Sequence, residues 1–130
     1  MKELTEFGAG FFDETGELMQ VSFSLYQVVL HFERMTIDIQ QSCEIACPEG
    51  RRWVWQEEER DREQRTGEPR MSDMTGFAKL LESEIERHEV LPGGKLRLVF
   101  SNGCVLLLWD HDNGYESFTV EKKGEGLIVI

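Results

Sequence analysis

The sequence lacks any uninterrupted apolar run of about 18 residues, the length that a membrane-spanning helix needs. Its first residues, Met-Lys-Glu-Leu-Thr-Glu, place acids where a secretory signal needs cations and then an apolar core. Basic residues are few as well, 14 against 25 acids, and the formal net charge is −11. We therefore expect a soluble cytoplasmic protein without a membrane partner. Direct binding to nucleic acid is disfavoured, because phosphates repel an acidic chain.

Cysteine is also scarce, with Cys43, Cys47 and Cys104 only. An odd number of cysteines without an export signal predicts reduced thiols that pack as small hydrophobic side chains. The spacing of Cys43 and Cys47 is not the two-residue gap of a zinc knuckle, and residues four apart on a strand lie about 13 Å apart. A metal shared with Cys104 and a histidine is the less favoured alternative, so we expect no metal and no cofactor.

What the sequence does contain is alternation of apolar and polar residues, in a chain whose 130 residues and 40% hydrophobic content suit one domain spanning 1–130. Residues 19–25 alternate in this way, and residues 36–45 sustain it longest. Such a pattern is typical of antiparallel strands with one buried face. The expected strands are residues 19–25, 27–32, 36–45, 52–56, 85–91, 95–100, 104–109, 116–122 and 127–130.

Two segments depart from this pattern. Residues 57–70 contain no apolar side chain, so we predict a mobile charged loop there. Ser72 or Asp73 can cap a short helix that carries Phe77 and Leu81 and ends near Glu82. The predicted fold class is therefore α+β and mostly antiparallel β, with two β-meanders and one short helix in the crossover between them.

The second meander echoes the first. Residues 27–39 laid on residues 95–107, without gaps, match Val28 to Leu96, Phe32 to Phe100 and Ile39 to Leu107. Alternation alone would produce much of this match. A duplicated meander remains a hypothesis at this point.

No constellation specifies an enzyme. The polar segment at residues 110–116 resembles the start of a calcium loop, but a glycine stands at the fifth ligand position, so the register fails. His31, His88 and His111 stand apart, and no serine lies in the setting of a nucleophile. We expect local turn hydrogen bonds in residues 110–116, or a loop that contacts a partner.

The tryptophans have two interpretations. A strand at residues 52–56 places Trp53 and Trp55 on one face, and packing in or near the core is the simpler role for them and for Trp109. Paired tryptophans beside a charged loop are also suitable anchors for a partner protein. The predicted partner-binding residues are Trp53, Trp55, Glu57, Glu58, Glu59, Asp61, Asp110, Asp112, Tyr115 and Glu116.

Two resemblances add to this. Gly-Lys-Leu-Arg-Leu-Val-Phe-Ser-Asn-Gly-Cys at residues 94–104 and Tyr-Glu-Ser-Phe at residues 115–118 resemble a small bacterial domain family of uncharacterised function, over residues 19–47 and 76–130. Its members carry a Tyr-Glu-Ser/Ala-Trp motif, and Phe118 replaces the tryptophan here. The resemblance implies a β-rich fold and no catalytic residues. A looser likeness, of kind and not of motif, is to acidic immunity proteins of bacterial toxin systems, including contact-dependent growth inhibition.

Two functions compete, and a third, an enzyme or metal-dependent hydrolase, rests only on Asp110, His111, Asp112 and the cysteines. The first is an immunity-type protein that binds and neutralises a cognate toxin, expected to be a basic nuclease, because an acidic surface speeds and selects association with a cationic one. The second is a non-enzymatic housekeeping or ligand-binding domain that dimerises through the apolar edge strand at residues 127–130. We expect a monomer or a weak dimer.

Overall fold

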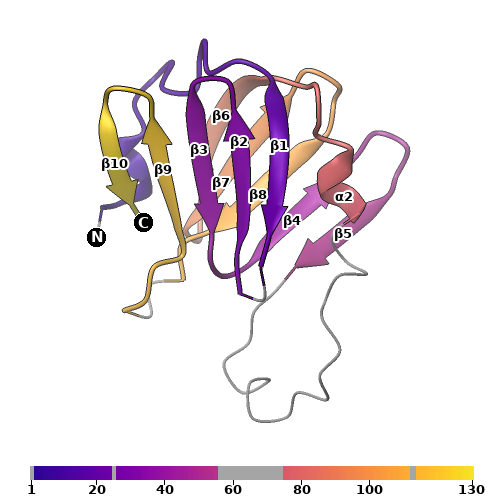
Figure 1. Cartoon of the computed structure of the whole chain (residues 1–130). Helices are drawn as coiled ribbons and strands as arrows, with labels where there is room; N and C mark the ends of the chain where they lie inside the picture. The colour runs from indigo at the N-terminus through magenta and orange to yellow at the C-terminus, as the bar shows by residue number, and fades with distance from the viewer. Residues whose placement is uncertain (1, 25, 56–74, 112–113) are drawn as a thin grey trace.

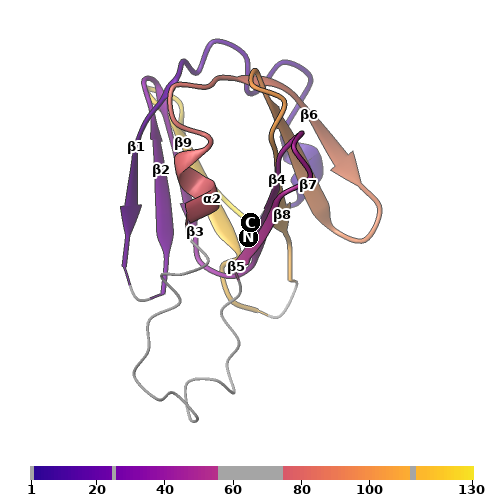
Figure 2. The same cartoon turned by 90° about the vertical axis from the view of Figure 1, so that its right-hand side faces the viewer.

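The computed structural model describes residues 2–24, 26–55, 75–111 and 114–130. Two five-stranded antiparallel sheets face each other (Figures 1 and 2), which confirms the predicted fold class. Sheet 1 runs in the order β1 (Leu18–Phe23), β2 (Val28–Phe32), β3 (Met35–Ile39), β9 (Phe118–Lys122), β10 (Gly126–Val129). Sheet 2 runs in the order β5 (Arg52–Trp55), β4 (Cys43–Ala46), β8 (Val105–Trp109), β7 (Lys95–Phe100), β6 (Ile85–Leu91).

The chain consists of two halves with the same topology. The 3₁₀ helix η1 (Leu4–Glu6) precedes β1–β5, and the helix α2 (Thr75–Ala78) precedes β6–β10. In each half the first three strands form a meander in one sheet, and the last two form a hairpin in the other sheet. The hairpin β4–β5 pairs with β8, and the hairpin β9–β10 pairs with β3. Each sheet is therefore built from both halves.

Details of the hydrogen bonding repeat as well. The β1–β2 pairing shifts register between Leu18 and Gln20, and the β6–β7 pairing shifts at the matching place, between Ile85 and Arg87. Glu17 and Glu84, which match each other, form an isolated antiparallel bridge. A bulge and a bridge at matching places are not consequences of alternation alone. They support the duplicated meander.

The ungapped match of the two meanders is wrong in its second strand. The register pairs Val28 with Ile39 in sheet 1 and Leu96 with Leu108 in sheet 2, so Ile39 matches Leu108 and not Leu107. The reason is the turn, because the segment between Phe100 and Cys104 is one residue longer than its counterpart in sheet 1. Gly103 takes a φ of +88° in this turn, a conformation that glycine adopts without strain.

The core lies between the sheets, where each strand contributes its inward-facing residues. Phe32 of sheet 1 and Phe100 of sheet 2 stack with ring centroids 6.2 Å apart. Short helices close the two open sides: Phe77 of α2 contacts Phe23, and Phe7 after η1 lies against Phe118. Fully buried aliphatic side chains fill the middle, namely Leu18, Val28, Leu30, Ile37, Ile39, Ile45, Leu80, Leu96, Leu98, Leu106, Leu108 and Val120.

Two predicted elements differ most from the observed ones. The strand expected over residues 36–45 is two strands, because the chain changes sheets at residues 40–42, where the Gln40 and Gln41 amides both donate to the Ser117 carbonyl. The helix expected to end near Glu82 ends at Ala78. The Glu82 amide instead donates to the Leu18 carbonyl, and Leu81 is exposed. Ser72 and Asp73 and the loop predicted at residues 57–70 lie outside the described residues.

The prediction of three reduced cysteines is wrong, because Cys47 and Cys104 form a disulfide and Cys43 alone is a free, buried thiol. Ala46 pairs with Val105, so the next residues along the two strands, Cys47 and Cys104, face each other. Spacing along the chain does not show this, since 57 residues separate the two cysteines. Burial, and secondarily the charge of Glu44, raises the pKa of the Cys43 thiol and keeps it protonated.

A substitution at Gly76 can test how tightly α2 packs against the rest of the protein. A Cβ at this position would lie 2.6 Å from a ring carbon of Trp53. Gly76→Ala should therefore lower the free energy of unfolding by about 1–3 kcal/mol through overpacking, although alanine favours a helix. Gly8→Ala is the matched control, because nothing lies within 4 Å of its Cβ position. Urea unfolding of both variants measures the difference, and equal stabilities would contradict the close contact.

Candidate functional site

The predicted contact loop connects β8 of sheet 2 to β9 of sheet 1, beside residues 40–42, which connect the two sheets in the opposite direction. Gln41 Nε2 donates to the carbonyls of Tyr115, at 3.4 Å, and Glu116, at 3.1 Å. Tyr115 is 64% exposed, Glu116 is exposed and Asp110 is half-buried. These three predicted residues therefore lie in one anchored loop, whereas Asp112 is outside the described residues.

His111 fixes the same loop from within. Its Nε2 accepts a hydrogen bond from the Ser42 amide at 3.3 Å, and its own amide donates to Ser117 Oγ at 2.9 Å. Burial lowers the pKa of His111, and the neighbouring Asp110 opposes that shift. The neutral imidazole is the form that accepts the Ser42 bond.

We expect this histidine to make stability depend on pH. The unfolded state binds a proton near pH 6.5, where the folded state does not, so the free energy of unfolding should fall as the pH drops below about 6.5. His111→Gln should remove that part of the dependence. His31→Gln, on the outer face of sheet 1, is the control. Unfolding by urea at a series of pH values measures both, and an unchanged profile in His111→Gln would refute the assignment.

The two predicted tryptophans do not stand free at the surface. Trp55 is 2% exposed and belongs to the core, while Trp53 is half-buried against Gly76, with Arg51 Cζ 5.8 Å from the centre of its ring. The packing interpretation is confirmed for both. The other predicted contacts, Glu57, Glu58, Glu59 and Asp61, lie outside the described residues.

A group of carboxylates that the sequence does not single out gathers at the opposite end of the sandwich, beside the Glu17–Glu84 bridge. The Glu17 amide donates to Glu33 Oε1 at 3.0 Å, and the Glu82 amide donates to the Leu18 carbonyl. Five exposed glutamates lie in three loops at this end, with the exposed Arg34 among them, and we call this surface the acidic end: Glu14, Glu17, Glu33, Glu82 and Glu84. The sequence signal was weak, because each loop contributes only one or two acids.

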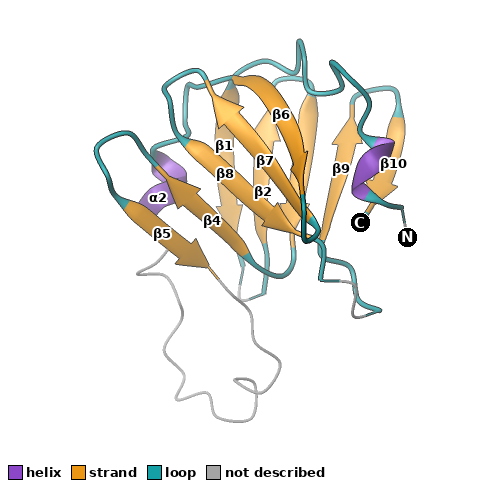
Figure 3. Cartoon of the chain, turned by 180° about the vertical axis from the view of Figure 1, so that it is seen from behind, coloured by secondary structure: helices purple, strands orange, loops and turns teal. Residues whose placement is uncertain are grey.

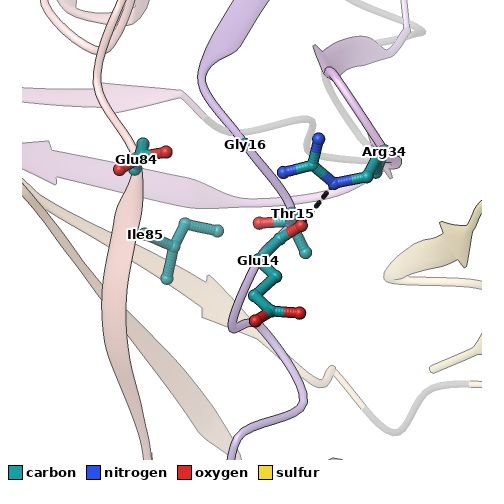
Figure 4. A pocket seen from close by; sticks show the side chains of 6 residues that line it. All are labelled: Glu14, Thr15, Gly16, Arg34, Glu84 and Ile85. Atoms are coloured by element: carbon teal, nitrogen blue, oxygen red, sulfur yellow. Dashed lines mark hydrogen bonds between the residues drawn. The ribbon is translucent and has the colours of Figure 1, made fainter.

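A cavity of about 480 Å³ opens at the acidic end, lined by Glu14, Thr15, Gly16, Arg34, Glu84 and Ile85 (Figure 4). Arg34 Nε donates to the Glu14 carbonyl at 2.6 Å, and the Arg34 amide donates to the Thr15 carbonyl. Arg34 thereby fixes the backbone of the loop, and its guanidinium also lies 3.7 Å from Glu33. The exposed carboxylates around it are suited to bind cationic groups.

Among the described residues no three His, Cys, Asp or Glu side chains are arranged to hold a metal ion. The described part of the chain also has no helix long and apolar enough to cross a membrane. At the apolar terminal strand, Leu127 is 55% exposed, but the Val129 carbonyl already accepts the Lys2 amide at 2.6 Å.

Fold and site together define a two-sheet antiparallel β protein with an acidic end formed by both halves. Comparison of the sequence with known families places residues 14–130 in a family of unknown function, DUF6188, and the chain belongs to that family. This agrees with the expected membership of an uncharacterised small-domain family. No curated protein and no solved structure matches the chain.

Proposed function

We propose that this chain works by binding another protein, without a catalytic step, and that its role is that of an immunity protein. In this proposal a cationic toxin domain, such as a nuclease, docks on the acidic end and is neutralised there. The observation that supports it best is the convergence of five exposed glutamates on one end of a chain with a net charge of −11. Nuclease active sites that hold phosphates are themselves cationic, so the charges complement each other.

The backbone at the acidic end supports the same proposal. Glu14 has a φ of +60° and Glu82 a φ of +65°, and these are the non-glycine residues with positive φ in the described chain. A glutamate in this left-handed region is strained, by about 1 kcal/mol or more, where glycine or asparagine would not be. Strain of this kind is common where a side chain serves binding.

A substitution at Glu82 can therefore distinguish an effect on partner binding from an effect on the stability of the fold. Glu82→Asn removes the carboxylate but suits the left-handed backbone, so we expect unchanged or slightly higher stability together with at least about fivefold weaker binding of the partner, equivalent to about 1 kcal/mol. The partner to use is the product of the neighbouring upstream reading frame, measured by calorimetry. Glu3→Gln, an exposed residue next to the Lys2–Val129 hydrogen bond and away from the acidic end, is the control and should bind as the unaltered chain does.

Two results would overturn the proposal. One is a neighbouring frame that encodes no toxin-like domain, together with no rescue of cells that express it. The other is binding of that product with no loss in Glu82→Asn and no dependence on salt, since contacts between charges weaken as ionic strength rises.

A further inference from the structure

The two halves provide a comparison within one molecule, because matching strands occupy matching places in the two sheets. β3 lies in the middle of sheet 1. Its outward-facing residues are Thr36 and Asp38, and Gln40, which directly follows the strand, lies on the same side. By the register of the neighbouring strands, the matching residues of β8 are Val105, Leu107 and Trp109. The same three outward positions are thus polar in one sheet and apolar in the other.

The outer face of sheet 1, which carries the polar residues, has the pattern expected of a solvated sheet face. Gln27 Nε2 donates to Asp38 Oδ2 at 3.4 Å, and His31 Nε2 lies 3.0 Å from Ser22 Oγ. On this face β1, β2, β3, β9 and β10 present two acids and no base, a formal charge of −2, on the outward residues Gln20, Ser22, Val29, His31, Thr36, Asp38, Thr119, Glu121, Leu127 and Val129.

On the outward side of sheet 2, the apolar residues extend beyond β8 to the neighbouring strands. Val105 lies between Val99 of β7 and Ala46 of β4, and Leu107 is separated from Val54 of the edge strand β5 only by Glu44. Val54 is 38% exposed, and Val105, Leu107 and Trp109 are half-buried. Figure 3 views this side of the molecule, and no described element lies over β4, β7 and β8. We call this surface the outer face of sheet 2.

Its charges differ in sign from those of the rest of the chain. Four bases and two acids border the apolar side chains, so the formal charge is +2, in a chain of net charge −11. Lys95 Nζ lies 5.4 Å from the centre of a Trp109 ring, and Arg97 pairs with Glu89 at 2.9 Å. These charged residues are Arg52, Arg87, Lys95 and Arg97, and Glu44 and Glu89.

We propose that the outer face of sheet 2 binds a second protein whose contact surface carries apolar side chains bordered by carboxylates. Charge complementarity selects that partner. A second copy would oppose +2 to +2, whereas a surface with acids can take Arg87 and Arg97 from Glu89 at little cost, because these salt bridges are exposed and contribute little stability. A tryptophan and arginines around an apolar centre also form the composition that dominates protein interfaces. This surface is distinct from the acidic end, and it goes beyond the proposed function.

The test uses two seven-residue peptides with the same apolar residues, Glu-Leu-Glu-Trp-Glu-Leu-Glu and the same sequence with lysine in place of glutamate. Binding to the full chain is followed by NMR, with each perturbed amide assigned. We expect the glutamate peptide to perturb β4, β7 and β8, with Leu107 and Trp109 among the largest shifts. The lysine peptide should not perturb this face.

Because the two halves match, the residues at matching positions of one sheet indicate which substitutions to make in the other. Lys95→Gln combined with Trp109→Gln copies Gln27 and Gln40 of sheet 1, and should weaken the glutamate peptide about tenfold, or about 1.4 kcal/mol. Thr36→Val copies Val105 on the opposite face and should leave the affinity unchanged. Thermal unfolding checks that both variants fold.

Five results would overturn the proposal, and the first four concern the peptides. These are no binding of the glutamate peptide, equal binding of the lysine peptide, perturbations confined to an edge strand or to the outer face of sheet 1, and an unaltered affinity in the double glutamine variant. A dimer of the chain that disappears in the double glutamine variant would also overturn it, because this face would then bind a second copy.

Discussion

Breaking the Cys47–Cys104 disulfide should lower the free energy of unfolding by about 4 kcal/mol. The bond joins residues 57 apart in the sequence, and closing a loop of that length restricts the unfolded chain by about this amount in the chain-entropy account. A domain of ordinary stability, about 5–15 kcal/mol, would keep its fold but with much of its margin lost. Urea unfolding with and without dithiothreitol measures the difference.

The control is the variant Cys47→Ala with Cys104→Ala. Its stability should be low and should not respond to dithiothreitol, because Cys43 has no partner for a disulfide. Thiol titration provides a second measurement: the denatured, unreduced chain should show one thiol and the reduced chain three. Three thiols before reduction would disprove the bond.

Truncation of Phe100 to alanine should destabilise the protein by about 3–5 kcal/mol. The side chain is fully buried between the sheets and stacks on Phe32 of the opposite sheet. The change therefore leaves a cavity between the sheets that neither sheet can close alone. Thermal and urea unfolding together measure the loss.

Phe23→Ala is the matched control, since it deletes the same atoms at the edge strand β1, where the side chain is 41% exposed. Its ring meets Phe77 of α2 at 5.9 Å, so we expect a smaller loss, about 1 kcal/mol. Equal losses at the two positions would mean that the sheets do not pack through Phe100.

The strands were the most predictable part of the fold. The expected bounds of β6 and β7 agree with the structure residue by residue, because β7 alternates and a Pro-Gly-Gly turn joins it to β6, although residues 84–89 by themselves also suit a helix. The boundary between β3 and β4 was missed. Ile39 and Cys43 both face the core, so the alternation continues through residues 40–42 although the chain passes from one sheet to the other.

The candidate sites were less predictable, for two different reasons. Asp110, Tyr115 and Glu116 are neighbours in the sequence, and the structure keeps them in one loop. The acidic end instead combines Glu14, Glu33 and Glu84, which come together only when two strand ends and a hairpin turn meet. Trp109 could be placed on a strand, but the face it occupies depends on the length of the turn before it.

The sequence by itself determined where most strands and turns lie and that most of the apolar residues form one buried side, because alternation and turn chemistry are local properties of the chain. Only the tertiary structure decided which sheet each strand joins, that Cys47 meets Cys104, and that β8 presents Leu107 and Trp109 outward. Strand pairing is set by hydrogen bonds and packing between distant segments. One extra residue in a turn moves every following side chain to the other face of its sheet.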